Sequence, residues 1–344
     1  MCLSMSAFDV AMPTALFAIV IGAMLLNKRI ESKLKTTFEE REFRTRDVIL
    51  LVIMISIAVS VVALFPSVQT LLLAVFLFSY STLLFAISYV FSDMKKNRAQ
   101  LFGSAFGAAS LVAGGVSLLN PFANSLMLYG SIAFFGLAAF AFFTVAYEQR
   151  KKEPKERVHL AVLPPALFLL LYVFFRGTPV WSPYLLDVYA VTFAVLVIVY
   201  MASLFTWKTT LLFAGLLTVV DIILVFGTRT MGTAATSLLD LGLPILVVLP
   251  HIPLQIVQGA IVFGGLGLGD FFFAGILATQ TYKKFGEKTA VISTIAMAIS
   301  LGIFYAIQLY YQIQFFPATV NIICGWLPVV AWKLLSERKA KTAE

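Results

Sequence analysis

The amino-acid sequence predicts an all-α fold, a polytopic membrane helical bundle, and three observations support this prediction. The chain of 344 residues is 60% hydrophobic and only 12% charged, whereas a soluble domain carries about 25% charged residues. Uncharged apolar runs recur along the whole chain, each long enough to cross a bilayer as a helix. No polar stretch between them is long enough to form a separate soluble domain.

Eleven segments are expected to span the membrane. They cover approximately residues 8–26, 48–65, 68–91, 101–119, 126–147, 160–175, 185–205, 209–227, 260–281, 289–313 and 317–335. The tight turns between several of them imply antiparallel neighbours. A further apolar segment, 243–258, is short and interrupted by prolines, so we expect an extended outer segment there rather than a span.

Positive charges are distributed unequally between the two sides of the predicted bundle. Apart from Arg176 and Arg229, every Lys and Arg lies in alternate connections or in the C-terminal tail. Positive loops stay in the cytoplasm, so we expect the N-terminus outside and the C-terminus in the cytoplasm. These juxtamembrane cations do not indicate a nucleic-acid partner. The lack of Asn-x-Ser/Thr sequons and of a retention signal favours a prokaryotic cell membrane, archaeal or bacterial.

Metal or cofactor chemistry is not expected from this sequence. There are two cysteines and two histidines, and no HExxH motif. A disulfide framework or a zinc protease would need more of these residues in characteristic spacings. We therefore predict no metal and no cofactor.

Two acidic residues lie well inside predicted spans, Asp221 and Asp270. An intramembrane carboxylate costs about 2.5–3.5 kcal/mol on insertion scales, so it indicates a functional site. Asp221 lies 13 residues after Lys208, and Asp270 lies 13 residues before Lys283. On antiparallel helices both are then about 20 Å from the cytoplasmic boundary, which places the two carboxyls at one level.

Four glycines precede the second aspartate in the segment Phe263–Asp270. Glycine costs about 1 kcal/mol in a helix interior and permits close backbone approach. Non-helical backbone at membrane depth is tolerated only where it is buried or lines water. We therefore expect partial unwinding next to Asp270, and close packing of its helix against the helix of Asp221.

Paired carboxylates at one depth leave three interpretations open. Two close carboxyls that share one proton can hydrolyse a peptide bond through an activated water. The same pair can bind a cation or proton in a transporter or channel. Each acid can also be structural, hydrogen-bonded to a hydroxyl or a backbone group.

Three motifs around these residues resemble a known family. Gly267–Leu268–Gly269–Asp270 fits the GxGD motif of presenilin and signal peptide peptidase, which are intramembrane aspartyl proteases. Residues 221–231, Asp-Ile-Ile-Leu-Val-Phe-Gly-Thr-Arg-Thr-Met, resemble the stretch after the first catalytic aspartate of signal peptide peptidases. The family's Pro-Ala-Leu motif is similar to Pro317–Ala318–Thr319, which opens the last span.

The resemblance implies a role for each motif in an endopeptidase that hydrolyses peptide bonds within transmembrane helices. Asp221 and Asp270 would be the catalytic pair. The residues implied to shape the site or position substrate are Gly267, Leu268, Gly269, Pro317, Ala318 and Thr319. Implied partners are the lipid bilayer and transmembrane helical peptides or membrane proteins. The cytoplasmic C-terminus is closer to signal peptide peptidase than to presenilin, which favours substrates with a cytosolic N-terminus.

The resemblance also implies a presenilin-like fold with nine core transmembrane helices. An extra N-terminal hairpin, residues 1–66, would account for the two additional spans. Residues 67–205 would then form the first helices of the core, and residues 206–344 the catalytic helices.

Two residues depart from the family pattern. Val220 stands where the family usually has a tyrosine, so a hydroxyl near the catalytic pair is missing. Thr319 replaces the leucine of Pro-Ala-Leu. The missing hydroxyl at Val220 bears on rate or substrate choice.

A substrate helix must unwind before it is cut, because its hydrogen-bonded carbonyls are shielded. We expect the extended segment 243–250, with Val247 at its centre, to offer a strand for such a substrate.

Overall fold

A computed structural model describes residues 8–37, 42–65, 68–119, 125–150, 157–228, 241–257, 259–313 and 316–342, and also residues 230, 232 and 234. These residues are mostly helical. The helices are α1 (Ala11–Thr37), α2 (Thr45–Leu64), α3 (Gln69–Val90), α4 (Lys96–Leu119), α5 (Ser125–Arg150), α6 (Val158–Ala161), α7 (Leu163–Phe175), η2 (Trp181–Leu185), α8 (Leu186–Ala202), α9 (Trp207–Ile222), η3 (Ile223–Gly227), α11 (Leu268–Phe285), α12 (Glu287–Tyr311) and α13 (Ala318–Thr342). The strands are β1 (Leu246–Pro250), β2 (Ile256–Val257), β3 (Ala260–Ile261) and β4 (Phe263–Gly267).

Ten helical segments within these described ranges are long and apolar enough to cross a membrane. They correspond to every predicted span except 260–281, which confirms the predicted helical membrane architecture. Many apolar side chains on their outer faces are exposed, as expected of surfaces that contact lipid.

The predicted helix from residue 260 is wrong at its beginning. Residues 260–261 and 263–267 are strands, and α11 begins only at Leu268. β4 pairs antiparallel with β1, with Val247 opposite Leu266 and Leu249 opposite Gly264. Glycines disfavour a helix here, and the β1–β4 ribbon satisfies backbone groups that lipid cannot. The expected loss of helix before Asp270 is confirmed, and so is the extended backbone around residue 247.

The chain divides into two compact units. The first contains Met1–Thr70 and Asp187–Glu344, and the second contains Leu71–Leu186. Both predicted catalytic aspartates and all the residues predicted to shape the site belong to the first unit.

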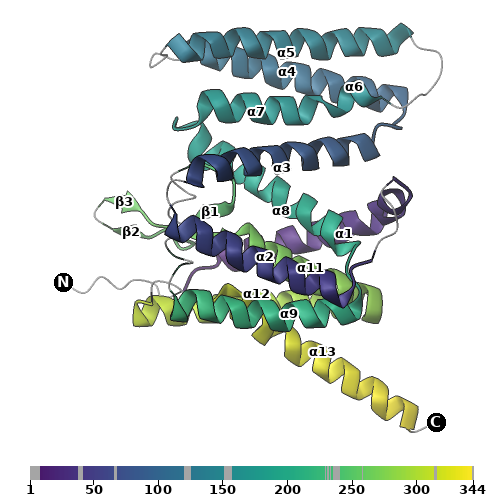
Figure 1. The fold of residues 1–344 in the computed structure, drawn as a ribbon, viewed down its shortest axis with the longest axis vertical. Helices are drawn as coiled ribbons and strands as arrows, with labels where there is room; N and C mark the ends of the chain where they lie inside the picture. The colour runs from purple at the N-terminus through teal and green to yellow at the C-terminus, as the bar shows by residue number, and fades with distance from the viewer. Residues whose placement is uncertain are drawn as a thin grey trace. The chain divides into compact units, whose positions relative to one another are not determined.

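The second unit contains an antiparallel pair, α4 and α5, with α7 beside both (Figure 1). Small residues of α4 face α5. A Cβ on Gly107 would lie 2.9 Å from the Phe142 ring, and one on Gly114 would lie 2.8 Å from the Phe135 ring. Glycine at these positions therefore lets the aromatic rings of α5 pack directly on the backbone of α4.

A buried ion pair joins the ends of α5 and α6 in this unit. Arg157 Nε lies 2.6 Å from Glu148 Oε2, and the Arg157 guanidinium also donates to the Met94 carbonyl. Both charged side chains are almost completely buried, so each depends on the other for compensation.

In the first unit, α11 is the central helix. It contacts α1, α9, α12 and α13 (Figure 1). Every residue from Phe271 to Thr281 is buried, as expected of a helix surrounded by other helices. Gln280 donates to the carbonyls of Ala202 and Phe205 at 3.0 and 2.6 Å, which fixes α11 against the end of α8.

The N-terminal helix α1 is part of this first unit and packs on α11 and α12. Just before its N-terminal end, Asp9 Oδ1 accepts hydrogen bonds from the N–H groups of Ala11 and Ile252 at 3.0 and 2.9 Å. Further along, Asn27 donates to the Val199 carbonyl at 3.0 Å. Whether the hairpin 1–66 is additional to a nine-helix core stays a prediction.

Candidate active site

Asp221 lies one residue before the end of α9, where the helix changes to the π-helical turn η3. Such turns are frequent at functional sites. Its side chain is 7% exposed, so the carboxyl is held inside the protein. Arg229 and Met231 of the predicted motif 221–231 lie outside the described residues.

Asp270 lies in the first turn of α11, two residues after the strand β4 gives way to the helix. A Cβ on Gly267 would lie only 3.1 Å from Asp270 Oδ2, whereas a Cβ on Gly269 would meet nothing within 4 Å. Gly267 therefore brings the backbone against the carboxyl. Leu268 is the first residue of α11 after β4, and its N–H donates to the Ile245 carbonyl at 2.9 Å.

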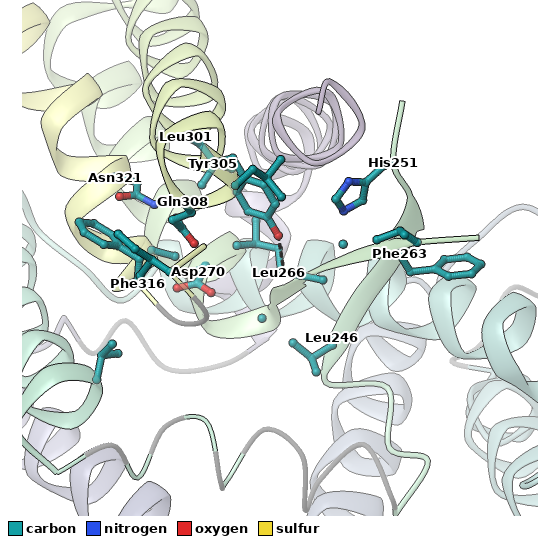
Figure 2. A pocket seen from close by; sticks show the side chains of 18 of the residues that line it. Leu246, His251, Phe263, Leu266, Asp270, Leu301, Tyr305, Gln308, Phe316 and Asn321 are labelled. Atoms are coloured by element: carbon teal, nitrogen blue, oxygen red, sulfur yellow. Dashed lines mark hydrogen bonds between the residues drawn. The ribbon is translucent and has the colours of Figure 1, made fainter. Parts of the chain in front are cut away.

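Asp221 and Asp270 line the same cavity, which has a volume of about 590 Å³. β4 forms one wall, and residues of α12 and α13 form another (Figure 2). The two acidic side chains thus come from contacting helices, α9 and α11, and share one space. This is the arrangement that their matched depths in the sequence predicted.

The first turn of α13 contacts Asp221 directly. The Thr319 hydroxyl donates to Asp221 Oδ2 at 2.6 Å, and the Thr319 N–H approaches the same oxygen at 3.4 Å. The first N–H groups of a helix have no partner within it, so this N–H is free to bind the carboxylate. Ala318 lines the cavity, and Pro317 is buried and accepts the Val320 N–H.

Val247, the centre of the predicted extended segment, is 1% exposed and pairs with Leu266. It does not line the cavity, unlike its neighbour Leu246. Val247 therefore belongs to the packed side of the ribbon.

Polar side chains outside the predicted motifs complete the cavity wall. These are His251 from the ribbon, Tyr305, Gln308 and Gln312 from α12 and its C-terminal end, and Asn321 from α13. The available signal was the presence of polar residues at spacings of three and four in an uncharged apolar span. In a helix, such spacing predicts that positions 305, 308 and 312 share one face. His251 and Asn321 are not part of this pattern.

The chain is similar to a known protein family over most of its length. A sequence model of signal peptide peptidase matches residues 33–327, which is well over half of the chain. The chain belongs to the signal peptide peptidase family. A comparison with curated proteins finds no significant match.

As a member of the signal peptide peptidase family, the protein is an intramembrane aspartyl protease, an endopeptidase with a multi-pass membrane architecture. Membership confirms the hydrolytic interpretation over cation or proton transport. It also implies that the substrates are transmembrane peptides. The match begins at residue 33, so it includes α2 and leaves out most of α1.

Proposed function

We propose that Asp221 and Asp270 are the catalytic pair of this signal peptide peptidase homologue. The observation that carries the proposal is their shared cavity, reached from two contacting helices beside an unwound, glycine-rich strand. Thr319 and Gly267 would hold the two carboxyls, because the first binds Asp221 and the second leaves room for Asp270. Leu268, Gly269, Pro317 and Ala318 would shape the backbone around them.

The chemistry follows from two carboxyls that share one proton. The ionised carboxyl takes a proton from a water molecule, whose oxygen attacks the carbonyl carbon of the scissile bond. The neutral carboxyl donates its proton to the carbonyl oxygen. When the tetrahedral intermediate collapses, the proton acquired from water moves to the leaving nitrogen and the C–N bond breaks. The other carboxyl, now ionised, takes back a proton from one of the two hydroxyls as the C=O of the product forms.

The ribbon geometry determines where an unwound substrate strand could pair. In an antiparallel ribbon, the N–H and C=O of one residue point to the same edge, and successive residues alternate. Ile245 binds Leu268 across the ribbon, so odd-numbered residues of β1 face β4. At the other edge of β1, the Val248 N–H is already bound by Asp187 Oδ1 at 2.8 Å.

The other outer edge of the ribbon is that of β4; we call it the free edge because no strand of the described residues pairs with it. Leu266 and Gly264 face β1, and the carbonyl of Gly265 points to the other side, where the Tyr305 hydroxyl donates to it at 3.3 Å. We place the substrate strand on this edge rather than on residues 243–250. Val247 then supports the ribbon from its packed side and does not pair with substrate.

The distribution of Lys and Arg supports an orientation with the N-terminus outside and the C-terminus in the cytoplasm. We propose this orientation in a prokaryotic cell membrane, with single-span substrates whose N-terminus is cytosolic. A glycosylation-site and cysteine-accessibility map of the loops would test it. A C-terminus on the outside would contradict the proposal.

The catalytic pair is tested with purified protein and a labelled transmembrane peptide, by mass spectrometry of the products. Asp221→Asn and Asp270→Asn should each lower kcat by at least about 10³-fold, because each variant removes one partner of the acid–base pair. Asp47→Asn makes the same chemical change at an exposed helix start and should cleave normally. Normal cleavage by either cavity variant would refute the assignment.

A further inference from the structure

A polar face of α12 lines the cavity opposite the free edge of β4. Tyr305 and Gln308 lie three residues apart on α12, so they project from one side of the helix, and Gln312 is the residue that caps its C-terminal end. All three line the cavity, and Figure 2 shows Tyr305 and Gln308 directed into it from α12. Polar side chains inside a membrane are unfavourable unless they have partners or a function.

These side chains have unused hydrogen-bonding capacity. Within the part of the chain that the structure describes, the amide groups of Gln308 and Gln312 form no hydrogen bond with the protein. Asn321, on the neighbouring wall, is 1% exposed, and its Oδ1 has no hydrogen-bond partner among the described residues. The cavity therefore contains both donors and acceptors that a ligand can use.

An extended substrate segment presents two edges of backbone N–H and C=O groups. β4 has one free edge, so pairing with it satisfies only one edge of the substrate. A backbone polar group without a partner in an apolar environment costs several kcal/mol. The second edge of the substrate must therefore find partners on the other side of the cavity, which is the side of α12.

We propose that Tyr305, Gln308 and Gln312 bind the second backbone edge of the unwound substrate strand. This inference rests on the proposed function, because it places the substrate between β4 and α12. A glutamine amide has donors and an acceptor, so it can pair with the N–H and C=O of one residue. From Tyr305 to its last residue, Tyr311, α12 advances about 9 Å, which spans two same-edge residues of a strand at about 6.6–6.8 Å per pair; Gln312 follows directly.

Tyr305 also occupies the edge of β4 when no substrate is bound. In the structure its hydroxyl donates to the Gly265 carbonyl, which is the group that an incoming substrate N–H would bind. The substrate strand displaces this hydroxyl from β4. The released hydroxyl then faces the second edge of the same strand, together with the two glutamines.

The test uses transmembrane peptides in which one backbone amide at a time is replaced by an ester, at successive positions on either side of the scissile bond. Each ester removes one N–H donor. If both edges are bound, wild-type kcat/KM falls about five- to tenfold at consecutive positions of the strand, as expected for one lost hydrogen bond. If only β4 binds the strand, the loss appears at every second position, and the proposal fails.

The variant Gln308→Met/Gln312→Met removes the amides while keeping the side-chain length. Sensitivity to esters should disappear at the positions that face α12 and persist at the positions that face β4. Gln149→Met, the same change at an exposed site in the other unit, should keep the wild-type pattern. Unchanged two-edge sensitivity in the double variant would overturn the proposal.

Two features keep this test separate from the assignment of the catalytic pair. The ester scan is carried out on the wild-type enzyme. It can therefore refute the proposal even if the double variant does not fold. The Asp270→Asn variant is assayed on the unmodified peptide. Loss of its activity, together with one-edge ester sensitivity in the wild type, would refute the α12 contacts and leave the catalytic pair intact.

Discussion

The hydroxyl of Thr319 donates to Oδ2 of Asp221 at 2.6 Å, so the last span is connected directly to the first of the two intramembrane aspartates. This position is one of the two at which the sequence departs from the family pattern. The family's leucine could not make this bond. The other departure, Val220, removes a hydroxyl from the neighbourhood of the same carboxyl, and Thr319 supplies one from α13.

Thr319→Val should lower kcat by about tenfold or more, because a hydrogen bond to a charged group is worth about 1.5–3 kcal/mol. KM should change little, since Thr319 binds Asp221 rather than substrate in this structure. Steady-state cleavage of a transmembrane peptide measures both constants. Thr319→Ser retains the hydroxyl and should retain most of the rate. Equal losses in the serine and valine variants would show that the hydroxyl is not responsible.

The two glycines of the GxGD motif should respond differently to alanine. In Gly267→Ala the new methyl group would lie 3.1 Å from Asp270 Oδ2, so the carboxyl must move and cleavage should fall sharply. Gly269→Ala meets nothing within 4 Å and lies in α11, where alanine is favoured. We expect Gly269→Ala to cleave faster than Gly267→Ala, and the two variants to have the same unfolding temperature. The reverse order of activities would contradict the placement of Gly267.

Asp187 should stabilise the ribbon through the outer edge of β1. Asp187→Leu leaves the Val248 N–H without its acceptor, which should lower the free energy of unfolding by about 1–3 kcal/mol. Asp187→Asn keeps an acceptor oxygen and should unfold close to the wild-type temperature. Thermal unfolding in detergent compares the two variants. A leucine variant as stable as the asparagine variant would show that the contact is dispensable.

Gly325 should be essential for the contact between α12 and α13. A Cβ there would overlap the Ala296 carbonyl oxygen, so Gly325→Ala forces the two helices apart. Overpacking of this kind costs about 1–3 kcal/mol, and the unfolding temperature should fall. Gly215→Ala on α9 meets nothing within 4 Å and provides the matched control. Equal unfolding temperatures for the two variants would be inconsistent with this packing.

Several features of the fold were predictable because lipid imposes simple rules on a sequence. Every predicted span except 260–281 has a counterpart among the ten apolar helices. The glycines before Asp270 correctly indicated unwinding. The beginning of α11 was placed eight residues too early, because an apolar run of strand length cannot be distinguished from helix by composition. Pairing of β4 with β1, a contact distant in sequence, decided the boundary.

Hydropathy, charge placement and motifs were enough to predict the membrane class, the two intramembrane carboxylates at one depth and the three motifs around them. These follow from local rules, because a charge in an apolar run and the rise of a helix can be read without knowing any neighbour. Three relationships become visible only in the folded molecule: Thr319 binds Asp221, Tyr305 binds the outer edge of β4, and Gln308 lines the same cavity. Such relationships depend on how helices distant in sequence rotate and pack against one another, and that rotation is set by side-chain packing rather than by hydropathy.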